Sequence, residues 1–198
     1  DVTPVQAGKG TMFIQRSGRK LREMAFFYDV DGFRATDMSI LAEHITQGGV
    51  SELAFQREPN PIVWAIRDDG ALLGCSYDRD LDALRAGWHR HFVGGVSDAG
   101  GTSAIVESIT VIPSPDTSRY DLWLSVQRWI DGQTFRSIEY LTRIFEDSVD
   151  QEDGFFVDCG LTYDGVPNDT ISGLDHLEGE TVSICGDGSV YADQVVAS

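Results

Sequence analysis

The sequence predicts a mostly β protein made of repeated four-stranded antiparallel units of the β-propeller-blade type, with one short helix. The first observation behind this prediction is a strand–turn–strand pattern that occurs three times, at residues 12–28, 62–77 and 122–141. Apolar and polar residues alternate roughly along each arm, as they do in a half-buried strand. The second observation is the turn, which is Ser17-Gly18 in the first copy and Asp-Gly in the other two.

The two Asp-Gly turns, Asp69-Gly70 and Asp131-Gly132, predict two-residue type I′ hairpins, because both central residues of such a turn need a positive φ. The third observation is a further strand that runs up to a proline, at residues 50–59 and again at 106–115. A short alternating strand at residues 88–92 precedes the second of these. Each unit therefore holds about four strands, which matches a propeller blade better than a solenoid coil.

Residues 37–45 predict the one helix, because Thr36 or Asp37 can cap it, Gly48-Gly49 can end it, and its apolar residues share one side. We expect it to pack against the rim of the repeat array. The pattern changes near residue 145. We therefore divide the chain into a repeat region at 1–145, an acidic linker at 146–154 and a small, incomplete β module at 155–198. The strands expected in that module are 181–185 and 189–191.

The charge balance disfavours nucleic acid and anionic membranes as partners. The chain has 15 Lys+Arg against 32 Asp+Glu, a net charge of −17, which repels phosphates unless a local basic patch intervenes. The one candidate patch surrounds a turn, so we expect a solvated hairpin tip and no specific DNA binding; it consists of Arg16, Arg19, Lys20 and Arg22.

The cysteines and the chain ends bear on the cellular setting. Cys75, Cys159 and Cys185 are odd in number and lack CxxC spacing, which argues against a disulfide framework and a thiolate zinc site and favours synthesis in a reducing compartment. No signal peptide and no apolar run long enough for a membrane span is visible. The chain begins at Asp1 and ends in an apolar stretch, so we expect a piece of a longer polypeptide.

Two clusters of side chains could hold a metal ion. His89 and His91 are two residues apart, so a strand places both imidazoles on one face, but no third ligand is evident nearby. The flanking Trp88 and Phe92 favour a half-exposed strand instead. Whether this pair binds a metal is left open by the sequence, and we assign no metal ligand.

The second cluster, Asp78, Asp80 and Asp82, has the spacing with which calcium loops begin. An EF-hand loop would need Gly where Ala83 stands and Glu where His89 stands, so the resemblance to such a loop fails, although metal binding by the three carboxylates is likewise left open. A further acidic stretch, from Asp29 to Gly32, is typical of a turn.

No pattern of residues predicts catalysis. The sequence has no G-x-S-x-G motif, no His next to a cysteine, and only isolated histidines at His44 and His176, which we interpret as structural. Paired carboxylates could act as glycosidase acids, but with 32 to choose from the sequence nominates no pair. We therefore expect no enzymatic activity, no catalytic residue and no cofactor.

Eight segments spread over nearly the whole chain carry a family resemblance. They include MFIQRSGRKLRE at 12–23 and SGLDHLEG at 172–179, with the others at 41–46, 62–74, 87–91, 106–109, 121–124 and 138–141. Together they resemble the tail nozzle or hub proteins of tailed bacteriophages, the tail tubular protein B-like family of short-tailed phages. Members are several times longer, so the resemblance implies an excised portion of a larger chain.

The resemblance also implies a function. It implies a virion structural protein of the phage tail, assembled in the host cytoplasm into a homo-oligomeric ring below the portal and its adaptor, with DNA passing through only in transit during ejection. It supplies no catalytic residues. This chain departs from a finished propeller because it supplies only about two and a half blades, so closure needs further sequence or another chain.

Two functions from other classes remain alternatives. The first is a carbohydrate- or receptor-binding β module, in which loops and aromatic side chains such as Trp88, Trp123 and Trp129 contact a ligand. An exposed aromatic cluster beside acidic residues would favour it. The second is a tail-associated hydrolase that uses paired carboxylates, which would release a sugar or lipid product.

Overall fold

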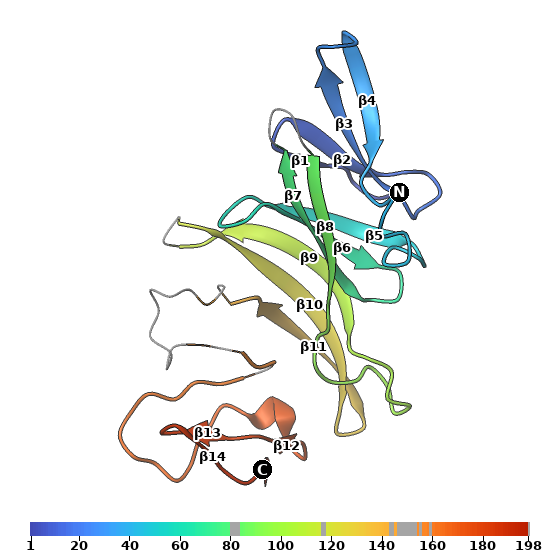
Figure 1. The fold of residues 1–198 in the computed structure, drawn as a ribbon. Helices are drawn as coiled ribbons and strands as arrows, with labels where there is room; N and C mark the ends of the chain where they lie inside the picture. The colour runs from blue at the N-terminus through green and yellow to red at the C-terminus, as the bar shows by residue number, and fades with distance from the viewer. Residues whose placement is uncertain are drawn as a thin grey trace.

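Consecutive strands of the chain form three antiparallel sheets, which succeed one another along the molecule in the computed structural model (Figure 1). The model describes residues 1–79, 84–115, 118–142, 145, 154, 156–158 and 160–197. Within these ranges regular structure is almost entirely β, as the alternation of apolar and polar residues predicts. No helix among these residues is long and apolar enough to cross a membrane.

The first two sheets are four-stranded meanders in which the spatial order follows the chain. The first contains β1 (Val5–Ala7), β2 (Gly10–Ile14), β3 (Leu21–Phe27) and β4 (Gly32–Asp37). The second contains β5 (Val50–Gln56), β6 (Ile62–Arg67), β7 (Leu72–Arg79) and β8 (Leu84–His91). Both hairpins expected in this part of the chain, at 12–28 and 62–77, are thereby confirmed.

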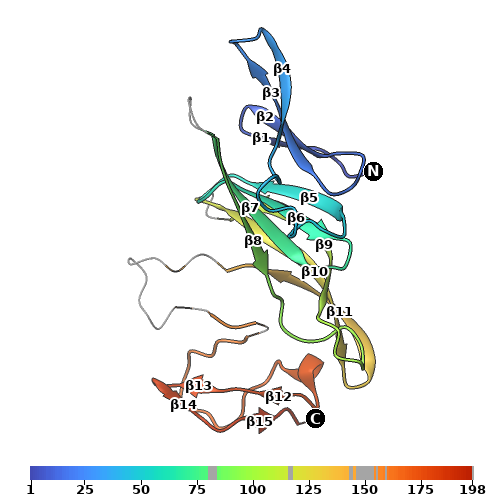
Figure 2. The same ribbon diagram turned by 45° about the vertical axis from the view of Figure 1, so that its right-hand side comes forward.

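The third sheet has three strands and not four. It contains β9 (Ile105–Pro113), β10 (Tyr120–Ile130) and β11 (Gln133–Tyr140) in the order β11-β10-β9. The chain therefore forms antiparallel units of four, four and three strands. The sheets follow one another in a row and no ring is closed among them (Figures 1 and 2).

The C-terminal segment is short of regular structure. It holds the 3-10 turn η2 (Asp175–Leu177) and two small ladders, one between β12 (Thr181–Val182) and β15 (Gln194–Val195), the other between β13 (Cys185–Gly186) and β14 (Ser189–Val190). The single strand expected at 181–185 is wrong, because β12 and β13 are separate two-residue strands with different partners, and the strand expected at 189–191 is shorter than predicted and ends at Val190. Of the expected acidic linker at 146–154, only Gly154 lies among the described residues.

Two apolar cores hold the three sheets together, one on each face of the middle sheet. One core joins the first sheet to the second through residues such as Met12, Leu21 and Val63. The other joins the second sheet to the third through residues such as Trp64 and Val126. Because both faces of the middle sheet are covered, five of the six residues of β6 are buried. Successive blades of a propeller pack on one another in this face-to-face manner.

The predicted helix at 37–45 is wrong. Asp37 is the last residue of β4, and residues 38–46 form turns. The backbone N–H groups of Ala42 and Ile45 donate to carbonyls three residues earlier, and Ser39 Oγ accepts the N–H of Leu21 on β3. The bond from Leu21, together with the insertion of Met38, Ala42 and Ile45 in the first core, fixes this nine-residue segment as turns. Nine residues are too few for a helix that is stable without tertiary packing.

The predicted type I′ geometry holds at only one of the two Asp-Gly turns. Asp131 and Gly132 have φ of 45° and 73°, which is the type I′ pattern. At the other turn only Gly70 has a positive φ, 83°. There the Asp69 carboxylate is held by the Arg67 guanidinium and accepts the N–H of Ala71, so a longer loop replaces the two-residue turn.

Candidate functional site

The outer face of the first sheet is apolar and uncovered. In the pairing register Phe13, Arg22, Met24, Phe26 and Phe33 all lie on the side opposite the first core. We call Phe13, Met24, Phe26 and Phe33 the N-terminal face. Phe33 is 72% exposed, and its ring meets that of Phe26 edge-on with centroids 5.4 Å apart. Exposed aromatic residues gathered on one sheet face mark an interaction surface more often than singly scattered ones do.

The outer face of the third sheet is the counterpart at the other end. Trp123 and Tyr140 are directly opposite each other on β10 and β11, with ring centroids 5.2 Å apart, and Ile138 beside them is 70% exposed. We call Ile112, Trp123, Ile138 and Tyr140 the C-terminal face. A shallow hollow of about 130 Å³ lies on it, lined by Trp123 and Ile138 and by the hydroxyl-bearing residues Ser108, Thr110 and Ser125.

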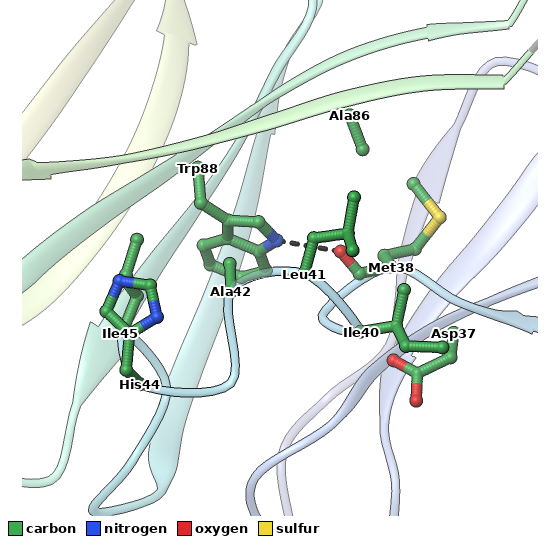
Figure 3. A pocket seen from close by; sticks show the side chains of 9 residues that line it. All are labelled: Asp37, Met38, Ile40, Leu41, Ala42, His44, Ile45, Ala86 and Trp88. Carbon is green, nitrogen blue, oxygen red and sulfur yellow. Dashed lines mark hydrogen bonds between the residues drawn. The ribbon is translucent and has the colours of Figure 1, made fainter.

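A second hollow lies between the turns at 38–46 and β8. It has a volume of about 440 Å³ and is lined by apolar side chains together with Asp37 and His44 (Figure 3). Trp88 forms one wall, and its indole N–H donates to the Met38 carbonyl at 2.8 Å. Trp88 also packs on the first core, so its ring holds the turn segment to the sheet and is not a free aromatic platform.

The two histidine rings on β8 are in direct contact. His89 and His91 lie on the same face of β8, as the sequence predicts, and His89 Nδ1 is 2.7 Å from His91 Nε2. His89 Nε2 is 3.3 Å from Ser76 Oγ, and the Trp64 indole packs against the His91 ring with centroids 4.9 Å apart. Burial lowers the pKa of both rings, and for His91 the neighbouring His89 lowers the pKa further.

Sequence reasoning missed a buried ionic cluster between the first two sheets. Glu23 on β3 is fully buried, accepts a hydrogen bond from the Tyr77 hydroxyl at 2.7 Å and forms an ion pair with Arg79. The Arg79 guanidinium lies 5.1 Å from the centroid of the Phe27 ring. Glu23 is more than fifty residues from Tyr77 and Arg79 in the sequence, so no local sequence pattern predicts this cluster.

The other candidates are dispersed. Asp78 pairs with Arg85, whereas Asp80 and Asp82 lie outside the described residues. Cys75 is buried and Cys185 exposed, both as free thiols, and Cys159 also lies outside that part of the chain. Among the residues that the structure describes, no group of three or more His, Cys, Asp or Glu side chains converges on a point where a metal ion could bind.

The basic candidate patch is partly neutralised by its own surroundings. Lys20 forms ion pairs with Glu43 and Asp37. Hydrogen bonds to these carboxylates raise the pKa of its ammonium group, and the bond to Glu43 has the larger effect. Arg22 donates to Gln15 and to a backbone carbonyl of β4. Arg16 and Arg19 are exposed at the hairpin tip. This arrangement leaves no row of free cations along a groove that could follow a phosphate backbone.

No protein-family model matches the sequence, and no curated protein sequence matches it significantly.

Proposed function

We propose that the chain is a structural module of a phage tail nozzle or hub, without enzymatic activity, which assembles by stacking the uncovered faces of its end sheets on other copies. The single observation that carries the assembly part is the contrast between the middle sheet, covered on both faces, and the end sheets, each with an apolar aromatic outer face. The phage tail assignment rests on the family resemblance of the sequence, with the ring and the DNA exit channel that it implies.

The internal packing of the chain indicates what would cover those faces. Two sheets of this chain already stack on the middle one through aliphatic and aromatic residues, which in an end-sheet strand such as β10 are buried at alternate positions. The uncovered faces offer the same kind of surface. Full burial of a side chain such as Phe33 or Ile138 stabilises by about 1.5–3 kcal/mol, so a few such residues on each side supply a substantial interface.

The distribution of charge favours head-to-tail stacking of copies. Residues 1–37, which form the first sheet, carry six Lys+Arg and five Asp+Glu. Residues 105–198 carry four Lys+Arg and 18 Asp+Glu. Two nearly neutral N-terminal ends have no electrostatic attraction for each other, and two acidic C-terminal ends repel each other. Contact between an N-terminal end and a C-terminal end avoids that repulsion. Contacts between unlike faces generate rings when the rotation closes, which is the form of a nozzle.

A complementation experiment tests this proposal. Phe33→Asp places a charge on the N-terminal face and Ile138→Asp places one on the C-terminal face. We expect each variant to lose self-association in sedimentation velocity, and an equimolar mixture to recover a dimer, because each variant still carries one intact face of the opposite kind. Val190→Asp, at an 81% exposed site on β14, serves as the control and should associate as the unaltered chain does.

The outcome that contradicts the assembly proposal is equally definite. If the unaltered chain remains monomeric up to ~1 mM, the stacking energy is below about 4 kcal/mol and the faces are not assembly surfaces. Loss of association in only one of the two variants would point to contact between like faces. The phage tail assignment is tested separately: portal and adaptor genes should neighbour the full reading frame, and a metabolic operon would exclude it.

A carbohydrate-binding module is the second candidate, favoured by the Trp123–Tyr140 ring pair beside the hydroxyl-bearing residues of the hollow. Flat aromatic rings next to hydroxyl groups can stack on a sugar and bond its edge. A glycan array probed with the chain, read with Trp123→Ala as the comparison, tests it. Glycan binding that Trp123→Ala abolishes supports this candidate, and an array without binding removes it.

A further inference from the structure

The His89–His91 pair lies against neighbouring strands of the middle sheet that fix the positions of both rings. Gly74 stands directly opposite His89 in the pairing of β7 with β8, and a Cβ added there would lie 2.1 Å from His89 Cε1. The missing side chain therefore leaves the space in which the imidazole lies across the neighbouring strand. Ser76 and Trp64 contact the two rings from β7 and β6. Three strands thus fix a pair that the sequence places only on one face.

Each ring nitrogen of His89 has one polar partner, Ser76 Oγ at Nε2 and His91 Nε2 at Nδ1. When the His89 proton is on Nε2 and is donated to Ser76 Oγ, the Nδ1 atom carries a lone pair and faces His91 Nε2. A hydrogen bond made by the other ring nitrogen commonly fixes the tautomer and orientation of a metal-ligating imidazole. The neutral imidazole is the form of histidine that binds a metal ion.

We propose that His89 Nδ1 and His91 Nε2 form a cis pair of ligands for a divalent transition-metal ion with right-angled coordination, Cu²⁺ or Ni²⁺, whose other positions are filled by water. Metal–imidazole bonds are about 2.0–2.1 Å long, so two ligands at a right angle are ~2.8–3.0 Å apart, a separation that the two hydrogen-bonded nitrogens, now 2.7 Å apart, reach with a small rotation of the rings. A tetrahedral ion such as Zn²⁺ would need about 3.3–3.4 Å from the same bond length. Tetragonal nitrogen and oxygen sites are typical of Cu²⁺ and Ni²⁺.

Binding of the metal ion releases no proton from the histidine pair. In the unbound pair His91 Nε2 donates its proton to His89 Nδ1; when the ion binds, that proton moves to His91 Nδ1, and the rings turn so that the two lone pairs converge on the metal. The backbone spacing of i and i+2 on one strand stays the same. The site is half-exposed, so water can reach the ion and complete its coordination.

The test uses Ni²⁺ alone, because Ni²⁺ does not oxidise the free thiols of the chain. Isothermal titration at pH 7.5 in a non-coordinating buffer should show one ion per chain with a Kd below ~100 µM, about −5.5 kcal/mol. In NMR spectra the ring protons of His89 and His91 should broaden before those of His44 and His176. Zn²⁺ should bind more weakly than Ni²⁺.

Variants separate this site from incidental binding. His91→Gln and His89→Gln should each weaken Ni²⁺ binding at least tenfold, and Ser76→Ala about tenfold through the loss of its orienting bond. His44→Gln is the control and should bind as the unaltered chain does. Circular dichroism of each variant confirms that it folds. Binding that survives His91→Gln, tighter binding of Zn²⁺ than of Ni²⁺, or no saturable binding at all would overturn the proposal.

Discussion

Replacing Arg79 should destabilise the chain more than replacing any exposed arginine, because Arg79 neutralises the buried Glu23 carboxylate between the first two sheets. Glu23 has no exposed surface, and its carboxylate contacts the Tyr77 hydroxyl and the Arg79 guanidinium. In Arg79→Met the stem still packs beside Phe27 while the charge is lost. The Glu23 carboxylate is then left buried with a single hydroxyl donor. An uncompensated buried charge of this kind strongly destabilises the folded state.

The magnitude follows from that burial. Breaking a buried pair costs about 3–5 kcal/mol, and since the Arg79 side chain is 25% exposed and partly screened, the lower end, about 3 kcal/mol, is expected. For a chain of this length each kcal/mol lowers Tm by roughly 2–4 °C, so Tm should fall by about 6–12 °C. Urea denaturation at pH 7, followed by tryptophan fluorescence, measures the free energy of unfolding.

Two further variants test whether burial of the Glu23 charge causes this loss of stability. Arg85→Met removes the exposed ion pair with Asp78 in the neighbouring pair of strands and should cost less than about 0.5 kcal/mol. Adding Glu23→Gln to Arg79→Met should recover at least about 1 kcal/mol, because a neutral amide leaves no uncompensated charge. If Arg79→Met and Arg85→Met lower the free energy of unfolding equally, the buried ion pair does not stabilise the contact between the two sheets.

Three other predictions concern the middle sheet. Gly74→Ala should destabilise by about 1–3 kcal/mol because its methyl group overlaps the His89 ring, whereas Gly87→Ala, which meets no atom within 4 Å, should not, as urea denaturation of the two variants will show. Burial raises the pKa of the Cys75 thiol to about 12, so a variant retaining only Cys75 should not react with a thiol reagent at pH 8 until unfolded, whereas one retaining only the exposed Cys185 should react at once. Burial lowers the pKa of His89 and His91 in the folded chain below the unfolded value of about 6.5. The stability that the two neutral rings contribute is therefore present above about pH 6.5 and is lost as the pH falls through the lower folded pKa. When both residues are replaced by Gln, the urea midpoint should drop less between pH 7.5 and pH 5 than it does in the unaltered chain.

The strands were predictable because their signal is local. Alternating residues such as those of β10, buried at every second position from Leu122 to Ile130, report the period of a strand that faces one core. The placement of His89 and His91 on one face followed from the same parity. The helix predicted at 37–45 failed because its apolar spacing is equally satisfied by turns whose residues Met38, Ala42 and Ile45 enter the first core.

The sequence by itself determined the strands, most of the hairpins, the acidic balance and the absence of a recognisable catalytic motif, since each of these depends on residue types at short spacings. Only the tertiary structure decided that the middle sheet is covered on both faces while the end sheets are not, and that Glu23 meets Tyr77 and Arg79. Those facts depend on which residues meet across sheets. Strand parity fixes the face on which a side chain lies, but the packing of one sheet on another fixes what it touches.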